Sequence, residues 1–207
     1  MVDYLYENNF LQHIEMYILR VNPKNASKVF ESLLVLGVDE QYIKKLLNTV
    51  GPNCDIVDMV KRFESRKKLR ILETWLNQRS IETKQPEIHN ALIKLAIDFG
   101  NQPEKLLREN RYYDVKEIGE FALSRDARLA IIAYQRDFGQ HDDEIIKITN
   151  SNALYRLQAV YLVQRQNIQL WKKALSEENE YRQHIIELLV SSILPESKEV
   201  EQVSCAV

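Results

Sequence analysis

The stretch HNALIKLAIDFGNQPEKLLRENRYYD, residues His89–Asp114, indicates the fold class of the whole chain. It predicts an apolar helix, a tight break at Gly100–Pro103 and a second, short helix. Four apolar residues follow the i, i+3, i+4, i+7 spacing of one helix face: Leu92, Leu95, Ala96 and Phe99. A helix pair of this size cannot bury both apolar faces by itself, so it needs neighbours built in the same way.

The break between the two helices has the composition of a helix start. Asn101 and Glu104 are three residues apart, as in a capping box, and Pro103 lies where the first helical turn begins. We therefore predict that Asn101 caps the second helix.

The rest of the chain repeats this pattern. Its clearest apolar stripe consists of Ile43, Leu46, Leu47 and Val50. Acidic residues stand where first turns are expected, as the helix macrodipole favours: Asp39, Asp55, Asp114, Asp126 and the run Asp142–Glu144. The longest break, the polar segment Asn77–Gln85, is predicted to be a loop. The pattern along the chain predicts about fourteen short helices. With only five Gly and five Pro a turn-rich β protein is not expected, so we predict no β-sheet.

An apolar triplet recurs at intervals that suggest a repeat. It occurs as Leu11–Ile14–Ile18, Leu69–Leu72–Leu76 and Leu154–Leu157–Tyr161, with starts 58 and then 85 residues apart. These intervals are close to two and three times 29, and about 29 residues fit one helix pair with its two breaks. The prediction is an all-α protein: residues 1–207 form one continuous α-solenoid of about seven stacked antiparallel helix hairpins.

The two ends of this array carry apolar residues, whereas a free array needs polar capping repeats. The predicted helix from Tyr4 contains Phe10 and Ile14, and the last segment includes Val203 and Val207. We therefore expect either that something else covers the two ends or that the chain is a segment of a longer array.

Composition limits the class of partner. The chain has 28 basic and 30 acidic residues, a net charge of −2, so it has no gross bias toward nucleic acid or anionic membranes. Cys54 and Cys205 form no CxxC spacing and suit free thiols in a reducing compartment. Because we also find no signal peptide and no apolar run of about 20 residues, we expect a soluble cytosolic protein.

Side chains that could carry chemistry do not form a recognisable site. His141 precedes Asp142–Glu144, but consecutive helical residues point to different faces and cannot surround one metal ion. His13 and His184 lack a third ligand, and there is no HExxH, Gly-rich phosphate loop or serine elbow. We assign no catalytic, cofactor-binding or metal-binding residue, and we expect the chain not to be an enzyme.

Two further patterns favour structure over nucleic-acid binding. The basic run from Arg66 to Arg70 lies beside Glu64 and Glu73, as in a solvated helix start. Ten tyrosines could stack on bases, but most fall on apolar stripes, where buried rings with the hydroxyl at the rim are commoner.

Three long segments resemble the clathrin heavy chain family in the same order along the chain. They are YLYENNFLQHIEMYI (residues 4–18), HNALIKLAIDFGNQPEKLLREN (89–110) and LYRLQAVYLVQRQNIQLWKKAL (154–175). Tyr112–Tyr113–Asp114 and Tyr181–Arg182 also fit this resemblance. Arg111, where the family usually has proline, and the segment Phe138–Asp142 depart from it, and both concern loop shape.

The resemblance implies a segment of the heavy-chain leg, without the adaptor-binding propeller or the trimerising hub. Its implied role is a scaffold that packs leg against leg in coated pits and vesicles during endocytosis and intracellular transport. The implied partners are other heavy chains and, mainly outside this segment, the light chain. Membrane association would be peripheral, on the cytoplasmic face, through adaptors bound elsewhere. Two alternatives stay open: a helical-repeat subunit of a vacuolar or endosomal tethering complex, and an RNA-binding helical repeat.

Overall fold

The computed structural model describes residues 2–21 and 25–193, and over these residues it consists of helices and connecting turns without a β-strand. The chain divides into two compact units, unit 1 at residues 1–125 and unit 2 at residues 126–207. The predicted all-α class is therefore confirmed.

Unit 1 contains nine α-helices in its described part: α1 (Val2–Glu7), α2 (Ile14–Met16), α3 (Ala26–Val35), α4 (Glu40–Val50), α5 (Ile56–Ser65), α6 (Glu73–Glu82), α7 (Pro86–Phe99), α8 (Pro103–Glu109) and α9 (Val115–Leu123). A π-helical turn at Tyr17–Val21 follows α2, and 3₁₀ turns occupy Leu11–His13, Gly51–Asn53 and Leu69–Leu72.

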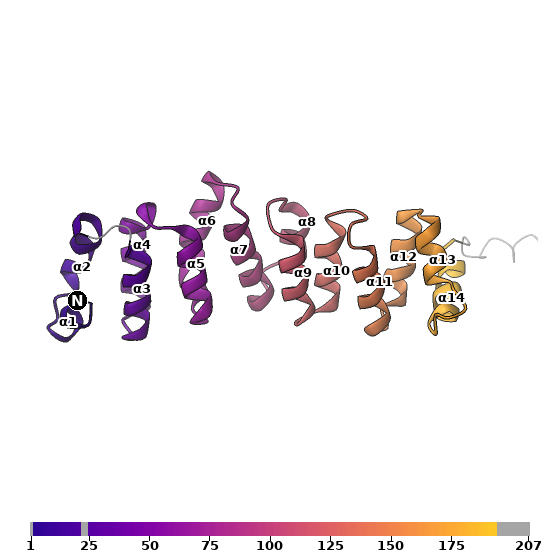
Figure 1. Cartoon of the computed structure of the whole chain (residues 1–207), viewed down its shortest axis with the longest axis horizontal. Helices are drawn as coiled ribbons and strands as arrows, with labels where there is room; N and C mark the ends of the chain where they lie inside the picture. Colours follow the sequence, from indigo (N-terminus) through magenta and orange to yellow (C-terminus); the bar gives the residue numbers. More distant parts are fainter. Residues whose placement is uncertain (1, 22–24, 194–207) are drawn as a thin grey trace, which may run out of the picture. The chain divides into compact units, whose positions relative to one another are not determined.

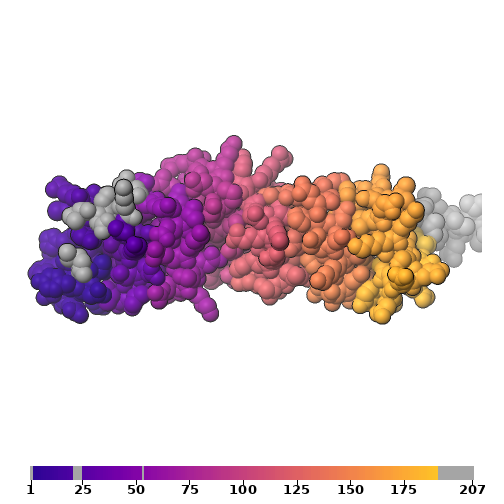
Figure 2. Space-filling model, in the orientation of Figure 1, coloured from indigo at the N-terminus to yellow at the C-terminus, as the bar shows by residue number. Residues whose placement is uncertain are grey.

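The helices of unit 1 stack in two layers. Helices α3, α5, α7 and α9 lie side by side and contact one another in that order (Figure 1). Helices α2, α4 and α6 contact one another in the second layer, and α3 with α4 and α6 with α7 form the contacts between layers. Side chains of successive helices close the spaces between the ribbons on the face shown in Figure 2.

Apolar side chains fill the space between the layers of unit 1. The stripe Ile43, Leu46, Leu47 and Val50 is buried, as predicted, and packs in one cluster with Phe30 and Phe63. Gly51 ends α4 against the indole of Trp75, and a Cβ at Gly51 would overlap that ring. The predicted break at this position is therefore a place of close packing.

Unit 2 contains five described helices: α10 (Ala127–Gln135), α11 (Asp142–Ser151), α12 (Tyr155–Arg165), α13 (Ile168–Ala174) and α14 (Arg182–Ile193). Contacts join α10 to α11, α11 to α12 and α12 to α14. Its buried apolar side chains include Ile131, Tyr134, Ile145, Tyr161 and Leu162.

The predicted acidic helix starts are confirmed. Asp39, Asp55, Asp114 and Asp126 are N-cap residues whose carboxylates accept a backbone N–H of the first turn. Asp142 to Glu144 open α11. Each such cap satisfies a donor that would otherwise have no intrahelical partner.

Two local predictions are wrong. The segment Asn77–Gln85 is not a loop, because α6 continues to Glu82 and leaves only three residues between helices. Asn101 does not cap α8 either. The N-cap is Gln102, with a left-handed φ of 51° and no side-chain cap, although Pro103 does begin the helix.

Several apolar residues assigned to buried stripes lie at the surface. Leu92 is half-buried and Leu95 and Ala96 are buried, but Phe99 is 56% exposed. In the third copy of the triplet Tyr161 is buried and Leu157 is exposed. The helix predicted from Tyr4 is interrupted, because Asn9 takes a left-handed φ of 59° and Phe10 is exposed. The segment predicted from Ser197 onward lies outside the described residues.

Candidate functional site

The acidic residues that follow His141 do not gather around one point: His141 Nδ1 lies 3.9 Å from Glu144 Oε2, whereas Asp142 and Asp143 pair with bases of other helices. The Asp142 carboxylate accepts two hydrogen bonds of 2.8 Å from Arg165, and Asp143 pairs with Lys173 at 2.6 Å. His141 packs against Tyr134, with ring centroids 5.1 Å apart. Elsewhere His13 lies near Phe10 and His184 stacks on Tyr155. No group of three metal-ligating side chains occurs within residues 2–21 and 25–193.

Two of the four bases in the basic run are paired with carboxylates of neighbouring helices. Arg66 pairs with Glu31 at 3.1 Å and Lys68 with Glu40 at 2.8 Å. Hydrogen bonds from Arg66 and Arg62 hold the pKa of Glu31 below its usual value. These contacts agree with a structural role for the run.

His89 and the tyrosine pair anchor α7 to the α8–α9 connection. The Asn110 amide donates to His89 Nδ1 at 3.0 Å, and the His89 ring lies 5.1 Å from that of Tyr112. Burial lowers the pKa of His89, and the buried Tyr113 hydroxyl donates to the Leu107 carbonyl at 3.2 Å. The cluster is thus explained by packing.

The most regular polar feature is a series of contacts between neighbouring helix pairs, which we call the inter-pair ladder. The partners are 27 to 31 residues apart, in agreement with the 29-residue repeat: Ser27–Asp58, Glu31–Arg62, Glu64–Lys94, Asn90–Glu117 and Asp98–Arg125 in unit 1, and Asp143–Lys173 in unit 2. Each contact joins a helix pair to the next along the chain.

Lys94 is the centre of the ladder in unit 1. From α7, its ammonium group reaches Glu64 Oε1 of α5 at 2.6 Å and Glu117 Oε1 of α9 at 2.8 Å. Burial opposes the charge, but the two carboxylates outweigh it and raise the pKa of Lys94. Because Asn90 also bonds Glu117 at 2.7 Å, three parallel helices are fixed in register.

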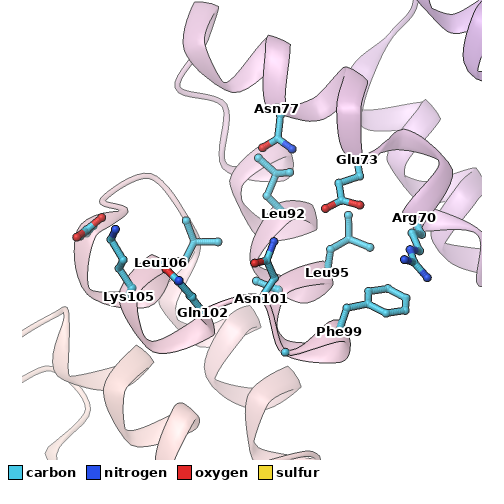
Figure 3. A pocket seen from close by; sticks show the side chains of 13 residues that line it. Arg70, Glu73, Asn77, Leu92, Leu95, Phe99, Asn101, Gln102, Lys105 and Leu106 are labelled. Carbon is cyan, nitrogen blue, oxygen red and sulfur yellow. The ribbon is translucent and has the colours of Figure 1, made fainter.

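A second feature of unit 1 is an open groove between two consecutive helix pairs (Figure 3). We call it the α6–α8 groove. It has a volume of about 550 Å³, and its lining comes from the 3₁₀ turn Leu69–Leu72, α6, α7, the turn after α7 and α8. The Arg70 guanidinium lies 4.6 Å from the Phe99 ring centroid at one end of it.

Sequence reasoning missed both features for identifiable reasons. The pattern around Leu92 suggested one narrow apolar face, whereas α7 is buried nearly all round, and Asn90 and Lys94 are buried with it. The sequence did contain one signal for the ladder: Asn90 and Lys94 are polar residues with apolar neighbours on the same helix. Phe99 lies in the last turn of α7 before Gly100 and lines the groove, and nothing in the sequence marked it as exposed.

No helix within the described ranges is both long enough and apolar enough to cross a membrane.

Comparison with known proteins identifies the family to which the chain belongs. Residues 47–186 match the family model described as "Region in Clathrin and VPS". Over 99% of its length the chain is 46% identical to clathrin heavy chain 1 of Arabidopsis thaliana, and over its full length it is 40% identical to the clathrin heavy chain of Dictyostelium discoideum. Clathrin heavy chain 2 of Homo sapiens is 39% identical, again over the full length. The chain spans only 12% to 13% of these relatives.

The family match covers the helices from the end of α4 to the start of α14, including most of the ladder and the whole lining of the groove. The helical stacking and the match along the chain agree, and we conclude that this chain belongs to the clathrin repeat family.

Proposed function

We propose that the chain is a structural segment of a clathrin heavy-chain leg and packs leg against leg in the lattice of coated pits and vesicles. The observation that carries this proposal is the inter-pair ladder, centred on Lys94, which locks successive helices in register. A scaffold needs contacts of this kind, which join each helix pair to the next along the chain. The relatives that match along the whole chain are named clathrin heavy chains, which supports the same role.

The proposal includes the organisation of the chain and its surroundings. We infer one continuous array of about seven helix pairs, a cytoplasmic location on coated membranes and no enzymatic activity. Other heavy chains are the inferred lattice partners, whereas the light chain and the adaptors contact mainly other parts of the full-length protein. Weak contacts between legs would add up through multivalency and permit reversible assembly.

A chimera tests this role. The matching segment of Arabidopsis clathrin heavy chain 1, 46% identical over 205 residues, is replaced by this chain, and coat assembly is measured by sedimentation and electron microscopy. We expect coats to form to the same extent as with the parent protein. A graft of equal length from an unrelated helical-repeat protein serves as the control and should not assemble.

The contrary result is a chimera that retains the parental helical content by circular dichroism but forms no coats. That outcome would remove the scaffold role and leave only the repeat fold. No observation in the described residues favours an RNA-binding repeat, because two of the four bases in the basic run, Arg66 and Lys68, are paired with carboxylates.

A further inference from the structure

The α6–α8 groove is not an unfinished end of the array. Its walls are two consecutive helix pairs, both present in unit 1, so the next pair along the chain would not fill it. Figure 3 shows Arg70 and Phe99 at one end of the groove and Lys105 at the other, with Leu92, Leu95 and Leu106 between them. The concavity is therefore a feature of the stacked pairs themselves.

Phe99 makes part of this groove apolar. The side chain is 56% exposed, and Arg70 covers one face of its ring at 4.6 Å. Leu92 and Leu106 are half-buried beside it. Removing apolar surface from water is favourable, so an apolar group placed against Phe99 would gain binding free energy.

The charged groups of the groove balance each other and are not paired. Arg70 and Lys105 supply two positive charges, and Glu73 and Glu109 supply two negative ones. Among the described residues, none of these four makes an ion pair. A lining with zero net charge does not favour phosphate-rich ligands or an anionic membrane surface. It suits a ligand that carries both charges.

Amide side chains supply further hydrogen-bonding groups. Asn77, Asn101 and Gln102 line the groove and are exposed. An amide has both a donor and an acceptor, which match the alternating N–H and C=O groups of an extended main chain.

The volume of the groove limits how much of a partner chain it can hold. Strand dimensions assign about 160 Å³ to each residue, so about 550 Å³ holds roughly three or four residues. In extended form these residues reach about 11 Å, enough to contact several positions along the groove. A helix would already use its main-chain N–H and C=O groups internally, so it would leave few of them for the amide side chains of the groove.

We propose that the α6–α8 groove binds an extended segment of a partner protein, in which one large apolar side chain is flanked by an acidic and a basic residue. The apolar side chain packs on Phe99 and Leu92, the acidic residue pairs with Arg70 or Lys105, and the basic residue pairs with Glu73 or Glu109. This binding function is separate from coat assembly and does not depend on it.

The probe is a fluorescein-labelled, end-capped peptide of nine residues, rich in Ser, with a central Leu, a Glu two residues before it and a Lys two residues after it. A second probe has the charges exchanged. Fluorescence anisotropy with the full 207-residue chain should show saturable binding of at least one probe. Replacing the central Leu by Ala should weaken that binding at least about tenfold, as expected for an anchor residue.

Variants of the chain locate the binding. Phe99→Ala should weaken binding at least about tenfold, and Arg70→Gln combined with Lys105→Gln should weaken it and reduce its salt dependence. Phe138→Ala is the matched control, because Phe138 is also exposed beneath an arginine, Arg165, but lies in unit 2 and outside the groove. This control should bind like the unmodified chain.

Several outcomes would overturn the proposal. One is that neither probe shows saturable binding. Another is that the Phe99→Ala chain binds the probe as well as the unmodified chain does, and a third is that a helix-stapled version of the peptide binds more tightly. Self-association that is lost in Phe99→Ala, without peptide binding, would assign the groove to a second copy instead. The Phe99→Ala chimera should still assemble coats, so failure of this inference and failure of the scaffold role are distinguishable.

Discussion

Lys94 shows how a single side chain can hold three helices together. The residue is only 9% exposed, yet its ammonium group lies between two carboxylates that are each about half exposed. We expect Lys94→Met to lower the free energy of unfolding by about 1–2 kcal/mol, because it keeps the apolar stem but leaves Glu64 and Glu117 without their cation. The change in the free energy of unfolding is measured by urea unfolding monitored by circular dichroism.

Lys61→Met is the control for that experiment. Lys61 is exposed on α5 and makes no ion pair among the described contacts, so its replacement should change stability by less than about 0.5 kcal/mol. Equal effects of the two substitutions would show that Lys94 adds nothing to the stacking.

Asp142 links stability to pH in unit 2. Burial opposes ionisation, but hydrogen bonds from Arg165 and Tyr161 outweigh it and hold the pKa of Asp142 below 3.8. The stabilising contribution is therefore complete above the unfolded pKa of about 3.8 and is lost as the pH falls through the lower folded value. Asp142→Asn should lower stability at pH 7 and make unfolding less sensitive to pH below about 4.

Thermal unfolding between pH 7 and pH 3 measures this effect. Glu178→Gln removes one negative charge from an exposed position of unit 2 that has no ion pair among the described contacts, and it should change stability at pH 7 by less than about 0.5 kcal/mol. An Asp142→Asn chain that is as stable as the unmodified one at pH 7, with the same acid response, would contradict the assignment.

At the scale of elements, the two kinds of predicted helix start behave differently. Asp114 accepts the Glu117 N–H at 2.7 Å, whereas Asn101 makes no cap. We expect Asp114→Ala to cost about 1 kcal/mol of stability, Asp114→Asn to restore most of it, and Asn101→Ala to cost less than about 0.5 kcal/mol. Denaturant unfolding compares the three variants, and a larger loss for Asn101→Ala would reverse the assignment of caps.

Most helices could be predicted from the sequence because their local signals agree. Asp39 caps α4 and the stripe from Ile43 to Val50 is buried, since capping and apolar spacing specify the same element. The polar segment after Leu76 was assigned to a loop because its face is solvated. It stays helical because it continues α6, which packs against α7.

The site was less predictable because it depends on which helices meet. Lys94 and Glu117 are 23 positions apart in the chain, and no local pattern pairs them. Likewise, the exposure of Phe99 depends on where the neighbouring helix pairs end. The family resemblance supplied the class of protein, but it did not identify these contacts.

At the scale of the whole molecule, the central claim is a continuous array of stacked helix pairs, and small-angle X-ray scattering of the full chain tests it most directly. Seven pairs at about 10 Å each give a length of about 70 Å and a radius of gyration of about 22 Å. A compact globule of 207 residues would have about 17 Å. The proposal predicts the larger value with an asymmetric distance distribution, and a value of about 17 Å with a symmetric distribution would contradict it.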